Sequence, residues 1–126
     1  MNLRNSVIVA VLATVLVGAV AFVARADAKA TKVKGWVVDS ACAFTKNLKK
    51  PASPECAISC AKAGSALVIL DDDGHIYWPI SDQMPAVGQN DRLMEFAGKR
   101  VVATGKLYER DGTRALAIDT IAADTK

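Results

Sequence analysis

Histidine is nearly absent from the 126-residue chain, in which His75 is the only one. No serine, histidine and aspartate are spaced as a catalytic triad, and no glycine-rich loop has the pattern that holds phosphate. The carboxylates form no pair with a distinctive setting for acid–base chemistry. Taken together, these absences favour a protein that is not an enzyme.

A strong charge of either sign is also absent. The whole chain has a formal net charge of +3, but Arg4 and Arg25 lie in an N-terminal segment that we expect to be removed. Without them, the chain has 14 basic and 13 acidic residues. A nearly neutral domain lacks the basic surface that nucleic acid requires, so we expect no nucleic-acid partner.

The N-terminal segment, residues 1–26, has the three parts of a secretory signal peptide. A short polar start precedes an apolar run over residues 6–24, and Ala24-Arg25-Ala26 matches a small-residue cleavage site. Cleavage after Ala26 would leave a periplasmic or secreted domain of 100 residues. The alternative is a single-pass membrane anchor, since a spanning helix needs roughly 20 residues. In either case the domain lies outside the cytoplasm.

The rest of the chain predicts one β-rich domain over residues 33–121, with a flexible lead-in at 27–32 and a C-terminal tail at 122–126. Runs of β-branched and aromatic residues, bounded by turn residues, mark the strands. Asp-Gly pairs at 73–74 and 111–112 mark two hairpins. We expect strands at 33–39, 66–70, 76–80, 100–108 and 113–121, and short helices at 54–63 and 91–96.

This order of elements is that of the OB-fold, a small closed five-stranded barrel. The expected fold class is therefore mainly β, with a short helix between strands three and four and a cysteine-bearing helix between strands one and two. Gly105 fits a bend at a barrel corner, and Gly35 predicts a bulge or sharp bend in the first strand. An open sheet with one helix across it is the alternative.

Two of the three cysteines lie on the inserted helix. Ser53 is a good N-cap and Pro54 suits the first helical position, so the helix should begin there. Cys56 and Cys60 then share one helical face with Cβ atoms about 6 Å apart, a spacing awkward for a mutual disulfide. The spacing suits two sulfur atoms that converge on a third group, for which Cys42 is the candidate.

Three chemical roles remain open for these thiols, and a fourth alternative is that they are buried and inert. A structural disulfide from Cys42 to Cys56 or Cys60 would staple the insert to the barrel in an oxidising compartment. A thiolate site would bind copper(I) or zinc, although zinc normally requires a fourth ligand. Thiol exchange is the third, but redox motifs usually have the spacing C-x-x-C rather than C-x-x-x-C.

Two further features have a structural as well as a functional interpretation. Trp36, Tyr77 and Trp78 lie on predicted strands and could form a stacking surface for a ligand, or could belong to the core. The run Asp71–Gly74 is similar to the start of a calcium loop, but the expected glutamate is absent and a hairpin turn explains it fully.

Several segments resemble a group of small exported bacterial OB-fold-like proteins of uncharacterised function. The group has a G-x-V-x-D-x-x-C opening, a C-A-x-x-C-x-x-x-G helix and a G-K-x-V-x-V-T-G strand, which residues 35–42, 56–64 and 98–105 resemble. The resemblance implies export and a barrel over roughly residues 33–121, and it implies no activity. A histidine often precedes the cysteine pair by three residues in the group, but Ser53 stands there in this chain.

From these patterns we expect an exported, non-enzymatic binding or structural module of the cell envelope with a disulfide-stapled insert. The alternative is a protein that handles copper or zinc, or exchanges thiols, through Cys42, Cys56 and Cys60. The expected partner is an envelope protein or a small ligand, and a membrane only if residues 6–24 are retained. Apart from copper or zinc, no cofactor is expected.

Overall fold

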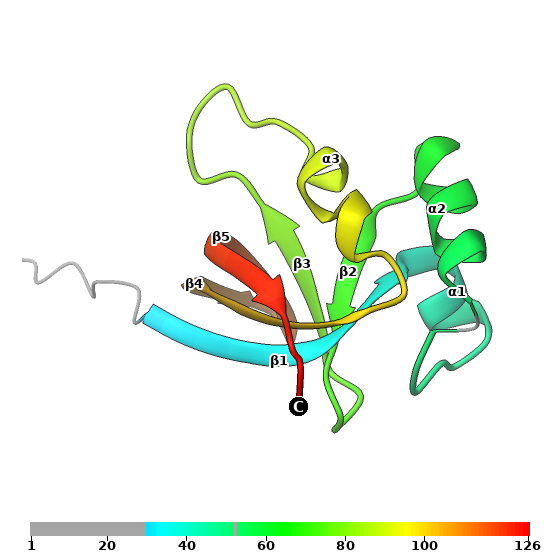
Figure 1. Cartoon of the computed structure of the whole chain (residues 1–126). Helices are drawn as coiled ribbons and strands as arrows, with labels where there is room; N and C mark the ends of the chain where they lie inside the picture. The colour runs from blue at the N-terminus through cyan, green and yellow to red at the C-terminus, as the bar shows by residue number, and fades with distance from the viewer. Residues whose placement is uncertain (1–29, 52) are drawn as a thin grey trace, which may run out of the picture.

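Five strands close into a barrel in the computed structural model, which describes residues 30–51 and 53–126 (Figure 1). Adjacent strands pair antiparallel, except that β3 and β5 are parallel. The expected mainly β, OB-like barrel is therefore confirmed. In their order around the barrel, the strands are β1 (Ala30–Asp39), β2 (Leu67–Leu70), β3 (Ile76–Ile80), β5 (Thr113–Ala123) and β4 (Arg100–Arg110).

In the described part of the chain, four short helical segments accompany the barrel. Both predicted helices are present: α2 (Pro54–Lys62) lies in the insert, and α3 (Asn90–Leu93) continues into the 3-10 turn η1 (Met94–Phe96) between β3 and β4. The helix α1 (Ser40–Thr45) was not expected from the sequence. Six residues make less than two turns, too few for a helical periodicity to show.

Two strands are longer than the sequence patterns predict. β1 begins at Ala30, and its first three residues pair with Lys106, Gly105 and Thr104 of β4. Residues 30–32 are thus part of the barrel and not a lead-in, because the long β4 offers them backbone partners. β5 likewise extends to Ala123, so residues 122 and 123 are strand rather than tail.

The expectations for the N-terminal segment fall outside the described residues, which begin at residue 30. They concern the signal peptide or anchor over residues 1–26 and the start of the lead-in. Among the helices that the structure describes, none is both long and apolar enough to cross a membrane.

Glycine allows the backbones to approach closely at two points where the barrel bends. A Cβ atom on Gly35 would overlap the carbonyl oxygen of Leu70, and one on Gly105 would overlap that of Ala117. The β4–β5 register also shifts between Thr104 and Gly105. The pairing of β1 with β4 is continuous through Gly35, so no bulge is present there. At both positions only a residue without a side chain fits.

The hydrophobic side chains form two clusters on opposite faces of β1. Val33 and Val37 belong to the main core cluster, which Ala57 and Ala61 of α2 join from the end of the barrel (Figure 1). Val38 belongs to a smaller outer cluster that is covered by α1. The insert therefore packs against the barrel interior through α2 and against its outer face through α1. The outer cluster comprises Val38, Ala43, Val68 and Leu70, with Trp36, Leu48, Ile76 and Trp78 packed against it.

Candidate functional site

Two N-caps of the same form position cysteines at the third residue of each insert helix. Asp39 accepts a hydrogen bond from the Cys42 N–H at 2.8 Å and begins α1. Ser53 accepts one from the Cys56 N–H at 3.0 Å and begins α2, as the sequence predicts. Each cap satisfies a backbone donor that the helix leaves free, so both thiols lie on the first turn of a helix with a fixed starting point.

The three thiols converge. The Sγ atoms of Cys42, Cys56 and Cys60 all lie within 4.8 Å of one another, and each residue is partly exposed. All three are free thiols. The prediction that the helical pair meets a third sulfur from the end of the first strand is confirmed, and α1 and α2 are adjacent at one end of the barrel (Figure 1).

The spacing of the sulfur atoms suits one shared ion. Three sulfurs bound to a single ion at about 2.3 Å would lie roughly 4 Å from one another, which is compatible with the observed limit. The pocket beside Cys42 and Cys56 has a volume of about 10 Å³. Its lining includes Cys42 and Cys56 but not Cys60, so only the spacing of the sulfur atoms supports a shared ion.

A buried carboxylate lies beside the thiols. The Asp39 side chain is 2% exposed and accepts hydrogen bonds from the Ser65 hydroxyl and the Cys42 N–H. Burial by itself would raise the pKa of Asp39, but bonds from Ser65 and from the Cys42 amide and thiol outweigh it and lower this pKa. Asp39 is therefore ionised at neutral pH.

The thiols are correspondingly hard to ionise. The hydrogen bond to Asp39, followed by desolvation, raises the pKa of Cys42 to about 11, although nearby Lys46 opposes the shift. Desolvation and then the Asp39 charge raise the pKa of Cys60. Because the thiolate is the nucleophile in disulfide exchange, protonated thiols make slow exchange catalysts at neutral pH.

No fourth protein ligand from the described residues joins the cluster. Within the described ranges, the group of cysteine, histidine and acidic side chains that meet at this point contains the three sulfurs alone. The Ser53 hydroxyl, at the position of the histidine in the resembling proteins, is engaged as the α2 cap. His75 instead bonds to Asp71 at 3.1 Å on the β2–β3 hairpin. A metal here would therefore have three protein ligands.

The acidic hairpin between β2 and β3 has a structural explanation. Asp71 accepts backbone hydrogen bonds from Asp73 at 3.0 Å and from His75 at 2.8 Å. These three side chains also approach within 4.8 Å of one another. Their hydrogen bonds are those of a tight turn, in agreement with the hairpin interpretation.

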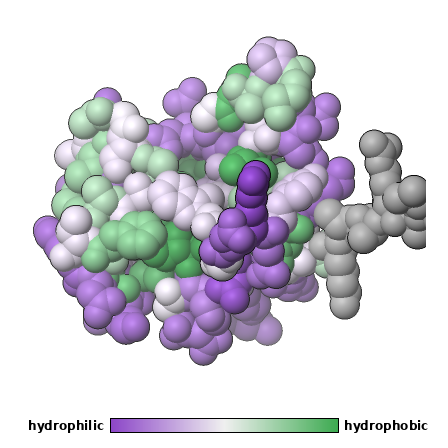
Figure 2. Space-filling model, turned by 180° about the vertical axis from the view of Figure 1, so that it is seen from behind, coloured by the Kyte–Doolittle hydropathy of each residue, from purple (hydrophilic) through white to green (hydrophobic). Residues whose placement is uncertain are grey.

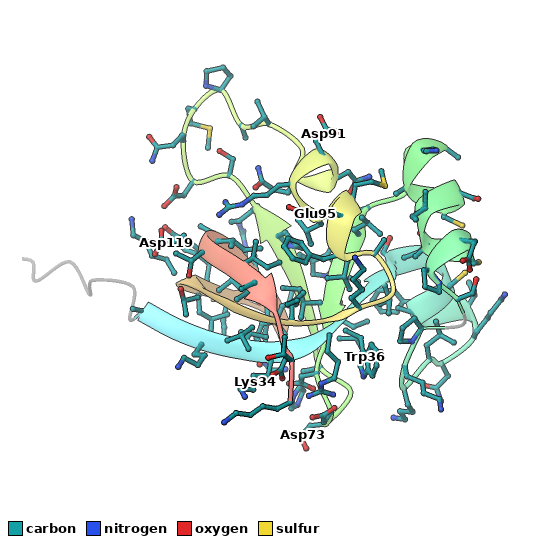
Figure 3. The ribbon with its side chains drawn as sticks, viewed as in Figure 1. Lys34, Trp36, Asp73, Asp91, Glu95 and Asp119 are labelled. Carbon is teal, nitrogen blue, oxygen red and sulfur yellow. The ribbon has the colours of Figure 1, made fainter. Side chains whose placement is uncertain are left out.

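The three aromatic candidates do not form one stacking surface. Trp36 lies in the outer cluster beneath the Arg100 guanidinium, and Trp78 is stacked against Phe44 with ring centroids 6.3 Å apart. Tyr77 packs against the barrel interior instead. Figure 3 shows Trp36 projecting from β1 on the same side as the insert.

Two residues of the site were not expected from the sequence: Asp39 and Lys46. The pattern D-x-x-C at the end of a strand would have indicated Asp39, because it repeats the cap-to-cysteine spacing of Ser53 and Cys56. Lys46 has no such signal, since its approach to Cys42 depends on the unpredicted helix α1.

Comparisons with protein-family models, curated proteins and solved structures found no match to this chain. The function must therefore be inferred from the chemistry of the three thiols and the residues around them.

Proposed function

We propose that the protein is an exported copper(I)-binding protein whose ligands are Cys42, Cys56 and Cys60. The observation that carries the proposal is the convergence of three sulfur atoms within 4.8 Å without a fourth protein ligand among the described residues. Soft thiolates select copper(I) or zinc, and three of them suffice for trigonal copper(I), whereas zinc normally takes four ligands.

The surrounding residues hold the ligands in place. Asp39 and Ser53 fix the first turns of α1 and α2, and with them two of the three sulfur atoms. Copper(I) binding releases thiol protons to solvent, because the metal binds the thiolate. The positive charge of Lys46, which lowers the pKa of Cys42, partly offsets the negative charge of the bound thiolates.

Anaerobic titration with copper(I) against a competing chelator tests the proposal. We expect one copper(I) per chain, and X-ray absorption should show three sulfur neighbours. Replacing any one of the three cysteines with serine should weaken binding at least about 100-fold, while the exposed Ser59→Ala on the same helix leaves it unchanged. Binding that survives all three cysteine replacements would contradict the proposal.

A disulfide-stapled binding module is the second candidate, and the packing of the insert favours it. The buried residues of its helices are Ala43, Ala57 and Ala61, which contribute little apolar area. A bond from Cys42 to Cys56 or Cys60 would add the restraint that this packing lacks. Counting the free thiols of denatured, oxidised protein by mass spectrometry separates the two candidates. One free thiol per chain and no bound metal would favour the disulfide over the copper site.

Export is part of the proposal and has its own test. We propose cleavage after Ala26, because the A-x-A site follows an apolar run over residues 6–24. The intact mass of protein recovered from the cell envelope should lack residues 1–26. Recovery of the full mass from the membrane fraction would show that the segment is an anchor.

A further inference from the structure

The insert and the part of the chain that follows it carry opposite net charges. Residues 40–63 contain four lysines and one glutamate, a net charge of +3. Residues 64–126 contain ten acidic and seven basic residues, a net charge of −3. The cysteine cluster therefore lies in the positive part of a domain that is nearly neutral as a whole.

Three of the four lysines of the insert follow Cys42 closely in the chain, and Lys46 acts directly on its thiol. Lys46, Lys49 and Lys50 are all exposed and follow Cys42 within eight residues. Within the described part of the chain, none of the three lies within ion-pair distance of a carboxylate. In contrast, Asp72 at the tip of the β2–β3 hairpin is paired with Arg100. The Lys49 ammonium lies against Gly74 of the acidic β2–β3 hairpin, where an added Cβ atom would be 3.3 Å away. The charges of Lys46 and Lys50 are thus the ones available to a partner.

An exposed aromatic ring adjoins these lysines. Phe44 is 63% exposed although it stacks on Trp78, and it lies two residues from Cys42 on α1. Figure 2 shows the molecule from behind, where apolar residues near the middle of the face are surrounded by hydrophilic ones. A large apolar side chain rimmed by polar residues is typical of protein contact sites.

The insert and the start of β1 lie at opposite ends of the barrel (Figure 1). β1 alone separates them by ten residues, roughly 33 Å in an extended strand. The insert is therefore remote from the end of the barrel at which the described chain begins (Figure 1).

We propose that the insert face, defined as Phe44, Lys46, Lys49 and Lys50, docks an acidic protein that exchanges copper(I) with the cysteine cluster. The inference rests on the proposed function and adds the class of partner. Copper(I) keeps its oxidation state in the exchange. Copper–sulfur bonds to the donor break as bonds to the three cysteines form, and the thiol protons pass to the buffer.

Two synthetic peptides serve as defined probes of this surface. Both contain the same pair of methionines as copper(I) ligands, flanked in one by aspartate and glutamate and in the other by lysine. We expect copper(I) transfer from the acidic peptide to be at least about tenfold faster at low salt, because opposite charges steer association. The difference should disappear near 1 M salt, where charges are screened within about 3 Å.

Matched charge-reversal variants locate the effect. The variant K49E/K50E should abolish the preference for the acidic peptide, while K32E/R110E, with the same change in net charge, keeps it. Lys46 is left intact because its charge acts directly on Cys42. The variant Phe44→Ser should slow transfer from the acidic peptide without changing the one-to-one copper content.

The outcomes separate the two proposals. If the wild-type protein takes no copper from either peptide at equilibrium, the copper site itself fails. If copper binds but both peptides deliver it at the same rate, only the docking surface is overturned. Binding to phosphatidylglycerol vesicles through Lys49 and Lys50, with no preference between peptides, would likewise overturn it in favour of a lipid surface.

Discussion

Asp39 is the residue on which the properties of the site depend most directly. It caps α1, accepts a hydrogen bond from Ser65 and lies close enough to the thiols to raise the pKa values of Cys42 and Cys60. The pKa of Asp39 is lower in the folded protein than in the unfolded chain. The bonds to Asp39 therefore stabilise the fold fully at pH values above the pKa that Asp39 has in the unfolded chain. That stabilisation is lost as the pH falls through the lowered pKa.

Replacing Asp39 with asparagine should make Cys42 more reactive in the reduced, metal-free protein. The change keeps a capping oxygen but removes the charge, so the pKa of Cys42 should fall from about 11 toward its ordinary 9.0. Alkylation of Cys42 at pH 8 should accelerate about tenfold, because the gain in thiolate exceeds the loss of nucleophilicity. Peptide mass mapping measures the rate.

The wild-type rate should keep rising as the pH increases from 8 toward 11, because the Cys42 thiol still carries its proton below its raised pKa. Asp72→Asn is the matched control, since Asp72 is paired with Arg100 and its replacement should leave the alkylation rate unchanged. Equal rates for Asp39→Asn and the wild type would show that Asp39 does not control this thiol.

At the scale of elements, strands and hairpins could be predicted because their signals are local. Alternating β-branched residues and two Asp-Gly turns mark the strands, and the Ser53-Pro54 start marks α2. The helix α1 was not predicted because its six residues are too few for a helical periodicity to show, and its Asp39 cap is also the last residue of a strand. Tyr77 packs against the main core cluster, whereas Trp36 and Trp78 pack against the outer one. This difference could not be predicted, because it depends on how the strands close into a barrel.

Gly105→Ala should test the tight approach of β4 and β5. An added Cβ atom would overlap the Ala117 carbonyl oxygen, which belongs to the backbone and cannot rotate away. The free energy of unfolding should fall by about 2 kcal/mol or more in denaturant titrations. Gly88→Ala has open space around it and should stay within about 0.5 kcal/mol of the wild type, so an equal loss in both would contradict the argument.

Ser53→Ala should weaken the insert through the loss of the α2 cap. The Cys56 N–H then has no side-chain acceptor, and stability should fall by about 1 kcal/mol. Copper(I) affinity should fall as well, because the first turn of α2 carries Cys56. Thermal unfolding and chelator competition measure the two effects. Ser59→Ala, on the exposed side of the same helix, is the control for replacing a serine with alanine. A similar loss of stability in this variant would show that the Ser53 capping bond is not the cause.

At the scale of the whole molecule, the barrel and the insert share hydrophobic clusters. Ala57 and Ala61 of α2 pack in the main core cluster, and Ala43 of α1 packs in the outer cluster with Val68. Ser40 and Ser65, at the two ends of the insert, also lie within 3.5 Å of each other through their hydroxyl groups. We therefore expect the insert and barrel to unfold together in a single transition.

This coupling predicts that copper(I) raises the melting temperature of the entire domain. A ligand held at 100 times its dissociation constant stabilises the folded state by about 2.7 kcal/mol, which corresponds to roughly 10–20 °C for a domain of this size. Anaerobic circular dichroism should show one transition that shifts with buffered copper(I) in the wild type and stays unchanged in Cys42→Ser. The opposite result would be an insert that copper(I) stabilises while the barrel melts at its original temperature. It would show that the shared clusters do not couple the two parts, and that the thiol site belongs to an independently mobile element.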